Sequence, residues 1–443
     1  MSKKLINNQK EIKNSSKRKQ IYSWALYDWA NSAFATTVMA GFFPIFFSQY
    51  WSNPDNLSIS TFYLGLGNSI ASLIVALLAP ILGAIADRGS YKKKFLIFFA
   101  FLGIVMTLSL GFIAQGMWPI ALLVYIFSTI GFSGANIFYD SLLPSVSNEE
   151  NVDHVSALGF SLGYLGGGVL IIINFLMISY PSSFGLLDAV EATKYAFISV
   201  GVWWALFSIP LILFVKEPKF HESENISDSV INGLVQFRNT FNDLKKLKVV
   251  ATFLLAYWLY IDGVDTVVRM AANFAFTLGF DQASIMGALV LIQLVAFVAT
   301  MVYIRLANYI GLKNGIYLGI IGYCIILFAG YFVESITHFY IVALLIGCFQ
   351  GGIQSISRSL YSRIIPENKA AEFYGFYNML GKFAAVFGPV LMGSVTLLLS
   401  NIVDDEIRAA RFGLLSIIIL FILGGYVFSK VDIDEGESIA KNL

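Results

Sequence analysis

The chain has 443 residues, of which 57% are hydrophobic and only 13% are charged, and its formal net charge is +1. Soluble domains carry about a quarter charged residues, so this composition, with a mean hydropathy of +0.73, excludes an ordinary water-soluble enzyme and predicts an integral membrane protein. A net charge near zero gives no electrostatic reason to expect a nucleic-acid partner. The two cysteines, Cys324 and Cys348, form no disulfide framework.

Residues 1–20 are polar and rich in lysine, and we expect a short disordered arm on the cytoplasmic side. The apolar runs that follow are long enough to cross a bilayer. They predict an all-α integral membrane protein with twelve transmembrane helices and both termini on one side. The expected spans are 22–51, 60–86, 95–114, 118–142, 155–180, 194–215, 249–275, 283–306, 314–333, 338–361, 371–400 and 410–430.

The placement of basic residues supports this topology. Most lysines and arginines fall in the loops on one side, as expected when both termini are cytoplasmic. The longest connection, a cytoplasmic linker at 216–248, separates two six-helix bundles at 21–215 and 249–430, and a cytoplasmic tail follows at 431–443. The second part of the linker has helical spacing of apolar and basic residues. An amphipathic helix on the inner membrane surface and an ordinary solvated helix both fit that pattern.

The first span carries polar residues that lipid should not tolerate. Asp28, Asn31 and Ser32 are three and four residues apart, which places them on one face of a helix. A carboxylate inside the membrane boundary is costly unless it faces protein or water, so Asp28 and Asn31 are candidates for solute binding, and Asp28 also for proton coupling. The alternative is that Asp28 lies close enough to the helix end to reach water or to cap it.

The loop between the second and third spans, residues 83–94, reads Gly-Ala-Ile-Ala-Asp-Arg-Gly-Ser-Tyr-Lys-Lys-Lys. It resembles the G-x-x-x-D-R-x-G-R-K loop that the major facilitator superfamily carries at this position. The resemblance implies a conformational latch between the two halves, formed here by Gly83, Asp87 and Arg88. The second glycine comes one place early, and Tyr91 stands near the usual basic position. A plain basic loop that fixes topology is the alternative.

Four further stretches, at 27–32, 159–167, 260–263 and 350–359, narrow the resemblance. Together they are similar to the branch of the superfamily that contains the autophagy-related vacuole effluxers and their bacterial relatives, the unknown major facilitator family. The resemblance extends over roughly residues 20–430 and implies two bundles around a central path. Yeast-type members are associated with amino-acid efflux from the vacuole, which makes amino acids the first expected cargo.

The seventh span has the densest buried charge. Asp262, Asp265 and Arg269 follow one another at three and four residues, hence on one helix face. Asp265 and Arg269 are predicted to form an ion pair that offsets part of their burial cost. Asp262 then has no evident local partner, which makes it a candidate proton carrier. In the alternative, Arg269 serves both acids in a closed structural triad.

The tenth span presents Gln350 and Gln354 along one stripe that also contains Arg358. Amides suit the recognition of a polar or zwitterionic solute. Arg358 lies nearer the inner end, where it could belong to the stripe or act as an anchor that reaches the membrane surface.

The eleventh span adds Asn378 and Lys382, four residues apart, as candidate solute-binding residues. Lys382 falls about half way across and requires an acid, a carbonyl or an anionic ligand group. Asp140, near the inner end of the fourth span, is expected at the membrane interface, and we assign it no role.

The sequence contains no metal-ligand cluster, Walker loop or dinucleotide fingerprint, so we expect no metal, no cofactor and no enzyme activity. The predicted function is secondary active transport of a small polar solute in the efflux direction, driven by the solute gradient or a proton gradient and not by nucleotide hydrolysis. Alternatives are an exporter of a drug, nucleoside or siderophore, and a non-transporting sensor or scaffold on the same fold. Expected partners are the solute, membrane lipid and protons, and a monomer is expected in a bacterial cytoplasmic membrane, or a vacuole membrane in a eukaryote.

Overall fold

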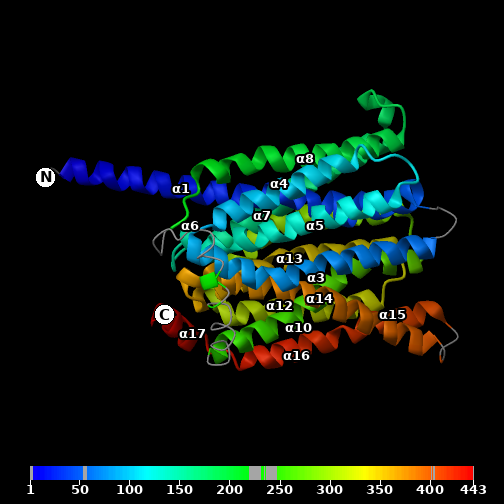
Figure 1. The fold of residues 1–443 in the computed structure, drawn as a ribbon. Helices are drawn as coiled ribbons and strands as arrows, with labels where there is room; N and C mark the ends of the chain where they lie inside the picture. The colour runs from blue at the N-terminus through cyan, green and yellow to red at the C-terminus, as the bar shows by residue number, and fades with distance from the viewer. Residues whose placement is uncertain are drawn as a thin grey trace.

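The computed structural model describes residues 3–52, 57–218, 231–233, 235, 247–400, 402 and 405–442. These residues form a bundle of long helices that run nearly parallel, with both termini at one end (Figure 1). We call that end the terminal end and the opposite end the far end. Because both termini lie at the same end of the bundle, the number of membrane crossings is even.

The first half contains α1 (Lys3–Ala33), which continues through the π-helical η1 (Phe34–Phe42), α2 (Phe43–Phe46) and η2 (Phe47–Trp51). The remaining long helices of this half are α3 (Leu57–Gly89), α4 (Lys92–Leu110), α5 (Trp118–Ser141), α7 (Val152–Ser179) and α8 (Ala189–Phe214), with the short α6 (Leu143–Val146) and η3 (Pro181–Phe184).

The second half contains α10 (Lys248–Thr277), α11 (Gln282–Ile310), α12 (Leu312–Tyr331), α13 (Ile336–Ile364), the short η4 (Glu367–Lys369) and α14 (Ala370–Ser400). It ends with α15 (Glu406–Ser416), α16 (Ile418–Ser429) and α17 (Ile433–Asn442).

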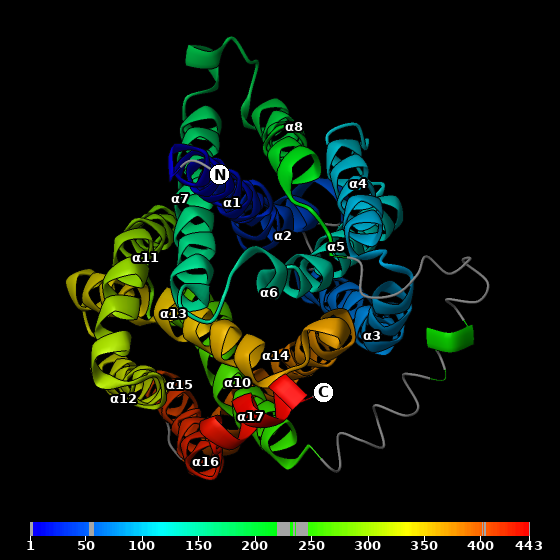
Figure 2. The ribbon, with the colours of Figure 1, turned by 90° about the vertical axis from the view of Figure 1, so that its left-hand side faces the viewer.

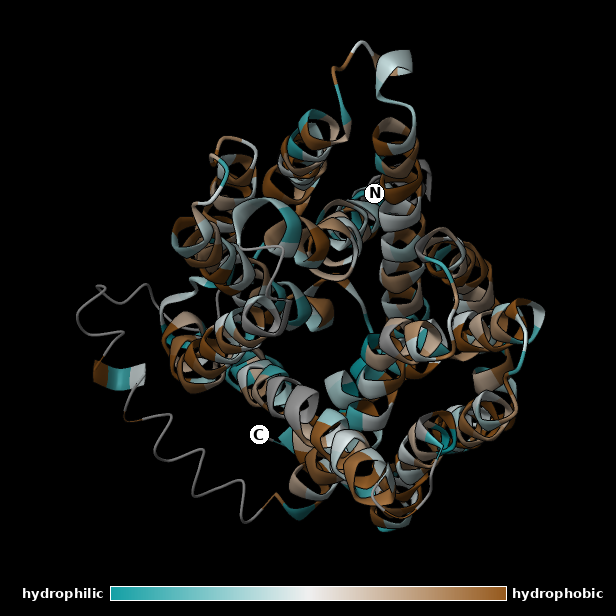
Figure 3. Ribbon diagram, turned by 90° about the vertical axis from the view of Figure 1, so that its right-hand side faces the viewer, coloured by the Kyte–Doolittle hydropathy of each residue, from teal (hydrophilic) through white to brown (hydrophobic). Residues whose placement is uncertain are grey.

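The predicted twelve-helix architecture is confirmed. Eleven helices among the described residues are long and apolar enough to cross a membrane, with α15 and α16 forming a single crossing. The twelfth crossing is α14, whose described part includes the apolar stretch Phe387–Ser400. Many large apolar side chains remain exposed on the outside, as in Leu77, Phe101 and Ile422. In the view from the far end, brown, apolar residues are frequent along the ribbons of the outer helices (Figure 3). Such faces are suited to contact with lipid.

The helix ends follow ordinary capping chemistry. At the far end, Asp188, Asp281, Ser335 and Asp405 each accept a hydrogen bond from the backbone N–H three residues later, at the starts of α8, α11, α13 and α15. A side-chain acceptor at this position satisfies an N–H that has no partner within the helix. Each of these caps therefore fixes the residue at which a helix begins at the far end.

One predicted segment differs from the structure, and another lies mostly outside the described residues. The arm at 1–20 is predicted to be disordered, whereas α1 already begins at Lys3. Residues 3–19 contain neither glycine nor proline, so nothing local interrupts the helix. Most of the predicted amphipathic helix in the linker lies outside the described residues. Within the described part, Gly233 lies against Ile85 of α3.

Each half has its own apolar core. One core is built from α1 to α8 and the other from α10 to α17, and only a few residues, such as Ala157, Met286 and Ala371, join the core of the opposite half. Seen from the terminal end, α3 lies beside α14, and α7 lies beside α11 and α13 (Figure 2). These helix pairs make much of the contact between the halves.

The turn between α3 and α4 explains how the latch loop departs from the superfamily pattern. Ser90 has a φ of 52°, in the left-handed region that glycine adopts most easily. Ser90 also stands where the pattern places its second glycine. Ser90 therefore adopts a backbone conformation in this turn that is strained for a residue with a side chain.

Replacing Ser90 by glycine should relieve that strain. We expect Ser90→Gly to raise the free energy of unfolding by about 0.5–1 kcal/mol, because the left-handed penalty disappears while glycine adds entropy to the unfolded chain. Thermal unfolding of the purified protein in detergent measures the effect. Gly116→Ala, at a φ of 79°, is the matched control and should lower the melting temperature. A Ser90→Gly melting temperature at or below that of the parent would contradict this account.

Candidate functional site

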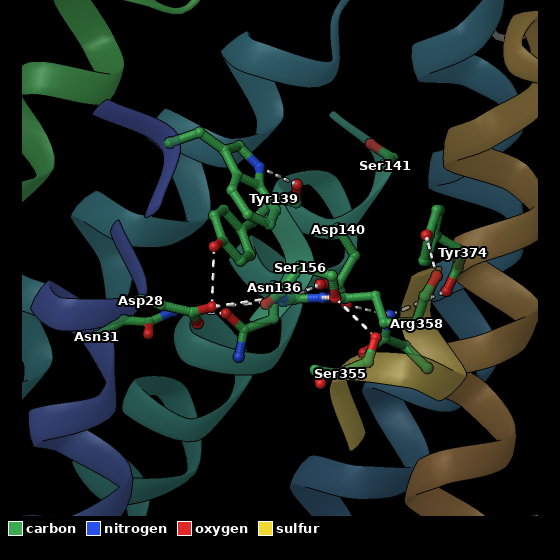
Figure 4. Close-up of polar contacts among 12 residues, drawn as sticks. Asp28, Asn31, Asn136, Tyr139, Asp140, Ser141, Ser156, Ser355, Arg358 and Tyr374 are labelled. Atoms are coloured by element: carbon green, nitrogen blue, oxygen red, sulfur yellow. Dashed lines mark hydrogen bonds and ion pairs between the residues drawn. The ribbon is translucent and has the colours of Figure 1, made fainter. Parts of the chain in front are cut away.

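The Arg358 guanidinium on α13 is a deeply buried basic group near the terminal end, and its side chain is 3% exposed. Its Nη1 donates to Asp140 Oδ1 at 3.0 Å and to Asp28 Oδ2 at 3.4 Å. Its Nε donates to Ser156 Oγ at 3.0 Å, and its Nη2 to the Ser156 carbonyl oxygen at 2.8 Å. Figure 4 shows Arg358 reaching across from α13 to α1, α5 and α7. One side chain of the second half thus binds three helices of the first.

Aromatic rings enclose the guanidinium. Its central carbon lies 4.1 Å from the ring centroid of Phe160, 5.0 Å from that of Trp24 and 5.5 Å from that of Tyr139. Tyr139 also donates its hydroxyl to Asp28 Oδ2 at 2.8 Å, and Trp24 stacks on Tyr139 with centroids 4.3 Å apart. Ring faces attract a cation and keep water out, so they strengthen the charge pairing beside them.

A glycine makes the room for this arrangement. A Cβ on Gly159 would lie 2.7 Å from Asp28 Oδ2, 2.9 Å from Arg358 Nη2 and 2.9 Å from the Tyr139 hydroxyl. One turn later, a Cβ on Gly163 would lie 2.6 Å from Ser32 Oγ. The small-residue face of α7 therefore lets α1 approach closely, and at Gly159 it accommodates the ion pair itself.

The cluster holds two carboxylates and one guanidinium, and α14 completes it. Asn378 Nδ2 donates to Asp140 Oδ2 at 3.3 Å, and the Tyr374 hydroxyl donates to the Arg358 carbonyl oxygen at 3.0 Å. We call Asp28, Asp140, Ser156, Arg358 and Asn378 the Arg358 network. It joins α1, α5 and α7 of the first half to α13 and α14 of the second.

The latch loop makes a second tie between the halves at the terminal end. Asp87 of α3 accepts the backbone N–H groups of Ala371 and Glu372, at 3.1 and 2.8 Å, in the first turn of α14. Lys92 pairs with Asp87 at 2.8 Å, and both side chains are almost fully buried. A carboxylate at a helix N-terminus satisfies free amides and complements the helix dipole.

The geometry refines the predicted latch. Gly83 allows the contact, because a Cβ there would lie 2.3 Å from the Ala371 carbonyl oxygen. Asp87 holds the start of α14 and pairs with Lys92, a residue that the predicted latch of Gly83, Asp87 and Arg88 did not include. Glu217, which follows α8, accepts the N–H groups of Lys92 and Lys93 and so fixes the start of α4. Burial raises the pKa of the Glu217 carboxyl, while these amides and Lys92 oppose the shift.

Peripheral ion pairs add to these ties. Arg363 at the end of α13 pairs with Asp153 of α7 at 2.6 Å and with Glu437 of α17 at 3.7 Å. Lys441 of α17 pairs with Glu149 at 3.1 Å, but both side chains are largely exposed, so this pair contributes little.

Nearer the middle of the bundle, α7 contacts the second half through neutral groups. The Tyr164 hydroxyl donates to Gln354 Oε1 at 2.6 Å, and Ser161 Oγ donates to the Phe297 carbonyl oxygen at 2.6 Å. Gln354, one of the predicted solute residues, therefore lies where the halves meet.

The acidic face of α10 is arranged differently from the prediction. Asp262 is buried and has partners: Oδ1 accepts the Gly388 N–H of α14 at 2.9 Å and the Thr266 hydroxyl at 3.3 Å. Sequence spacing could not supply this partner, because Gly388 is 126 residues away. A Cβ on Gly388 would lie 1.9 Å from Thr266 Oγ1, so only glycine fits there. The Asp265–Arg269 pair stays a prediction.

The predicted site residues fall into three groups. Asp28 and Asn378 belong to the Arg358 network, and Asn31, next to it on α1, donates to Asn136 Oδ1 at 2.5 Å. Gln350 and Gln354 lie farther from the terminal end on α13. Lys382 belongs to α14, but its side chain lies outside the described part of the chain.

The structure corrects one expectation from the sequence, for Asp140, and decides between two alternatives for Arg358. Asp140, which we placed at the membrane interface without a role, is 11% exposed and paired with Arg358. Arg358 is a central buried residue and not an anchor that reaches the surface. Sequence reasoning gave no role to Tyr139 and did not identify Ser156. Asn136 and Asp140 lie four residues apart with Tyr139 beside them, and this helical spacing was the available signal.

The described residues contain no group of three or more His, Cys, Asp or Glu side chains that could hold a metal ion. The site thus consists of side chains suited to pairing charges, donating and accepting hydrogen bonds, and binding protons.

A family model described as vacuole effluxer Atg22 like matches residues 16–441 of this chain. The MFS-type transporter YxiO of Bacillus subtilis, itself described as uncharacterized, is 37% identical over 425 residues, which cover 96% of this chain and 97% of that protein. Autophagy-related protein 22 of Yarrowia lipolytica is 22% identical, over 85% of this chain and 76% of that protein.

Solved structures with the same fold include the human organic anion transporter MFSD10 (TETRAN), with a TM-score of 0.72, 13% identity, and coverage of 93% of this chain and 99% of that one. The proton:xylose symporter XylE bound to 6-bromo-6-deoxy-D-glucose gives a TM-score of 0.70, 15% identity, and coverage of 96% and 98%. At these identities the likeness shows the major facilitator fold alone.

The space at Gly159 provides a direct test of the Arg358 network. Gly159→Ala should force Asp28 and Arg358 apart and lower the free energy of unfolding by about 1–3 kcal/mol, because overpacking a close contact is costly. Gly393→Ala is the matched control, since a Cβ there meets nothing within 4 Å. That variant should be neutral or slightly stabilised, as alanine favours helix. Melting temperatures in detergent compare the two, and equal shifts would refute the tight packing inferred at Gly159.

Proposed function

The chain belongs to the vacuole effluxer Atg22-like family of major facilitator superfamily transporters, and we propose that it exports amino acids from the cytoplasm by proton-coupled alternating access. That it is a multi-pass membrane transporter follows from its family and fold. The cargo, the direction and the coupling ion are the proposal. In this scheme the terminal end is cytoplasmic, as the basic loops predict.

The observation that carries the proposal is the Arg358 network. It ties the two halves together near the terminal end through ionisable groups. Separating a buried ion pair leaves uncompensated charge and costs about 3–5 kcal/mol. Opening of the terminal end therefore needs a compensating change, and protons on Asp28 and Asp140 supply it by removing the negative charges that Arg358 pairs with.

This gives proton coupling a physical basis. With both acids ionised, the network favours closure of the terminal end. With the acids protonated, the attraction between the halves weakens and opening toward the cytoplasm becomes cheaper. A ligand shifts such an equilibrium only by its difference in affinity for the two states. The proton has such a difference in affinity here, because Asp28 and Asp140 are paired with Arg358 in one state and separated from it in the other.

We propose that the solute site includes Asn378 of this network and extends from it along α13 toward the far end. Asn31, Gln350, Gln354, Asn378 and Lys382 are the candidate binding residues, from α1, α13 and α14. Amide side chains both donate and accept hydrogen bonds, which suits a solute with an amino and a carboxylate group. Lys382 would serve the carboxylate. Secondary transporters typically bind their solute near the bilayer midplane, between two structural repeats.

Asp262 is the second proposed coupling residue. Its bond to the Gly388 N–H joins α10 to α14 directly before Pro389. Proline interrupts the backbone hydrogen bonding of a helix and favours bending there. Protonation of Asp262 would weaken this tie and free the two parts of α14 to move relative to each other.

The family description names vacuole effluxers, whose direction is out of the vacuole and into the cytoplasm, so export from the cytoplasm is part of the proposal and does not follow from that description. Among the alternatives, a drug, nucleoside or siderophore exporter would use the same fold with a different central site. A non-transporting sensor or scaffold would keep the network but exchange no solute.

Proton coupling can be tested in proteoliposomes with the standard amino acids as a panel. Asp262→Asn should lower proton-driven accumulation at least tenfold and leave counterflow intact, because exchange needs no net proton movement. Asp28→Asn should lower accumulation equally and also weaken solute binding through the neighbouring Asn31. Accumulation and counterflow are compared in the same liposomes at two pH values.

Asp188→Asn is the matched control. Asp188 is an exposed helix cap at the far end, and asparagine caps equally well, so both activities should be unchanged. If Asp262→Asn and Asp28→Asn both accumulate solute as the parent does, proton coupling by these acids is contradicted. Absence of counterflow for every solute in the panel would instead favour another cargo or a non-transporting role.

A further inference from the structure

A set of polar side chains lies where α7 meets α11 and α13. A Cβ on Gly168 of α7 would lie 3.1 Å from the Gln293 Cβ of α11. One turn earlier on α7, the Tyr164 ring lies 2.8 Å from where a Cβ on Gly351 of α13 would be. The three helices are neighbours in the view from the terminal end (Figure 2). We call this region the α7–α11–α13 junction.

Two amide oxygens at the junction are buried and lack a donor among the described residues: Oε1 of Gln293 and Oε1 of Gln350. Gln350 precedes Gln354 by one helical turn on the same face of α13, and Gln354 Oε1 is satisfied by Tyr164. Burying an acceptor without a donor is destabilising, and such groups are rare in native proteins unless they have a further role. The junction therefore retains two acceptors at a cost to stability.

The hydrogen-bonding capacity of the two oxygens indicates which ligand group they would accept. A group that satisfies two carbonyl oxygens at once carries several N–H donors. A primary ammonium has three donors and no acceptor, whereas a carboxylate or phosphate offers only acceptors to these oxygens.

We propose that the α7–α11–α13 junction binds the ammonium group of the transported solute, through the amide oxygens of Gln293 and Gln350. The inference rests on the proposed function and goes further, because it assigns one end of the solute to a defined pair of acceptors. Gln293 belongs to none of the sequence motifs. Gln293 and Gln350 lie in the second half, and Tyr164 and Gly168 lie in the first. An ammonium group bound here would therefore lie at the contact between the halves.

The test separates binding from stability. Gln293→Met and Gln350→Met, combined, keep the side-chain length and remove both acceptors. Without solute, the double variant should melt at a higher temperature than the parent, because two unsatisfied polar groups are gone. It should nevertheless bind each amino acid that the parent binds at least tenfold more weakly, as measured by calorimetry on the purified full-length protein with the standard amino acids as probes.

Two controls define the chemistry. The desamino analogue of each bound amino acid, which keeps the carboxylate and side chain, should bind the parent at least tenfold more weakly than the amino acid and be unaffected by the double variant. Gln115→Met makes the same substitution in the exposed loop between α4 and α5 and should leave affinity unchanged.

The outcomes distinguish this inference from the proposed function. Parental affinity for amino acids in the double variant, or equal binding of desamino analogues to the parent, overturns the ammonium site while amino-acid transport stands. If the parent binds no amino acid and counterflow detects only solutes without an amine, both the ammonium site and the proposed cargo fail.

Discussion

A positive charge in a medium of low dielectric constant must be paired, and Arg358 is the place where this constraint organises the protein. Its guanidinium cannot be deprotonated at accessible pH, so the structure has to bring acids and acceptors to it. Asp28, Asp140 and Ser156 come from three different helices of the first half. The energetic requirement of one side chain therefore becomes a contact between the two halves.

The helices approach closely enough for this pairing because glycine, which has no side chain, lies at the contact points. Gly159 leaves the volume in which Asp28 and Arg358 meet, Gly83 brings the start of α14 to Asp87, and Gly388 lets Asp262 reach a backbone amide. In each case glycine lies where a carboxylate of one helix meets another helix. Without a hydrophobic force between helices in lipid, such close packing and buried hydrogen bonds hold the bundle together. Under the proposed mechanism, these are the places that separate when a proton removes the charge.

The sequence predicts the parts of this account that depend on local periodicity. Long apolar runs and basic loops predict the helices and their pairing into two halves, and i, i+3 and i, i+4 spacing marks Asp28, Asn31 and the stripe on α13. It could not reveal that Arg358 would pair with Asp28 across 330 residues, or that Asp262 would find the Gly388 amide, because such partners depend on how helices pack. Asp140 was misjudged for a related reason: depth along a helix indicates distance to the surface, but not whether a neighbouring helix covers the side chain.

The central claim is that Arg358 holds the two halves together at the terminal end. Spin labels at Glu150→Cys in the first half and Glu435→Cys on α17, in a background with Cys324 and Cys348 replaced by serine, report the distance between the halves by electron–electron resonance. A second pair, Glu150→Cys with Ser182→Cys, lies within the first half and checks that the fold is intact. We predict that Arg358→Gln moves the distribution between the halves to longer distances and leaves the pair within one half unchanged. Identical distributions between the halves in the parent and Arg358→Gln would contradict the account.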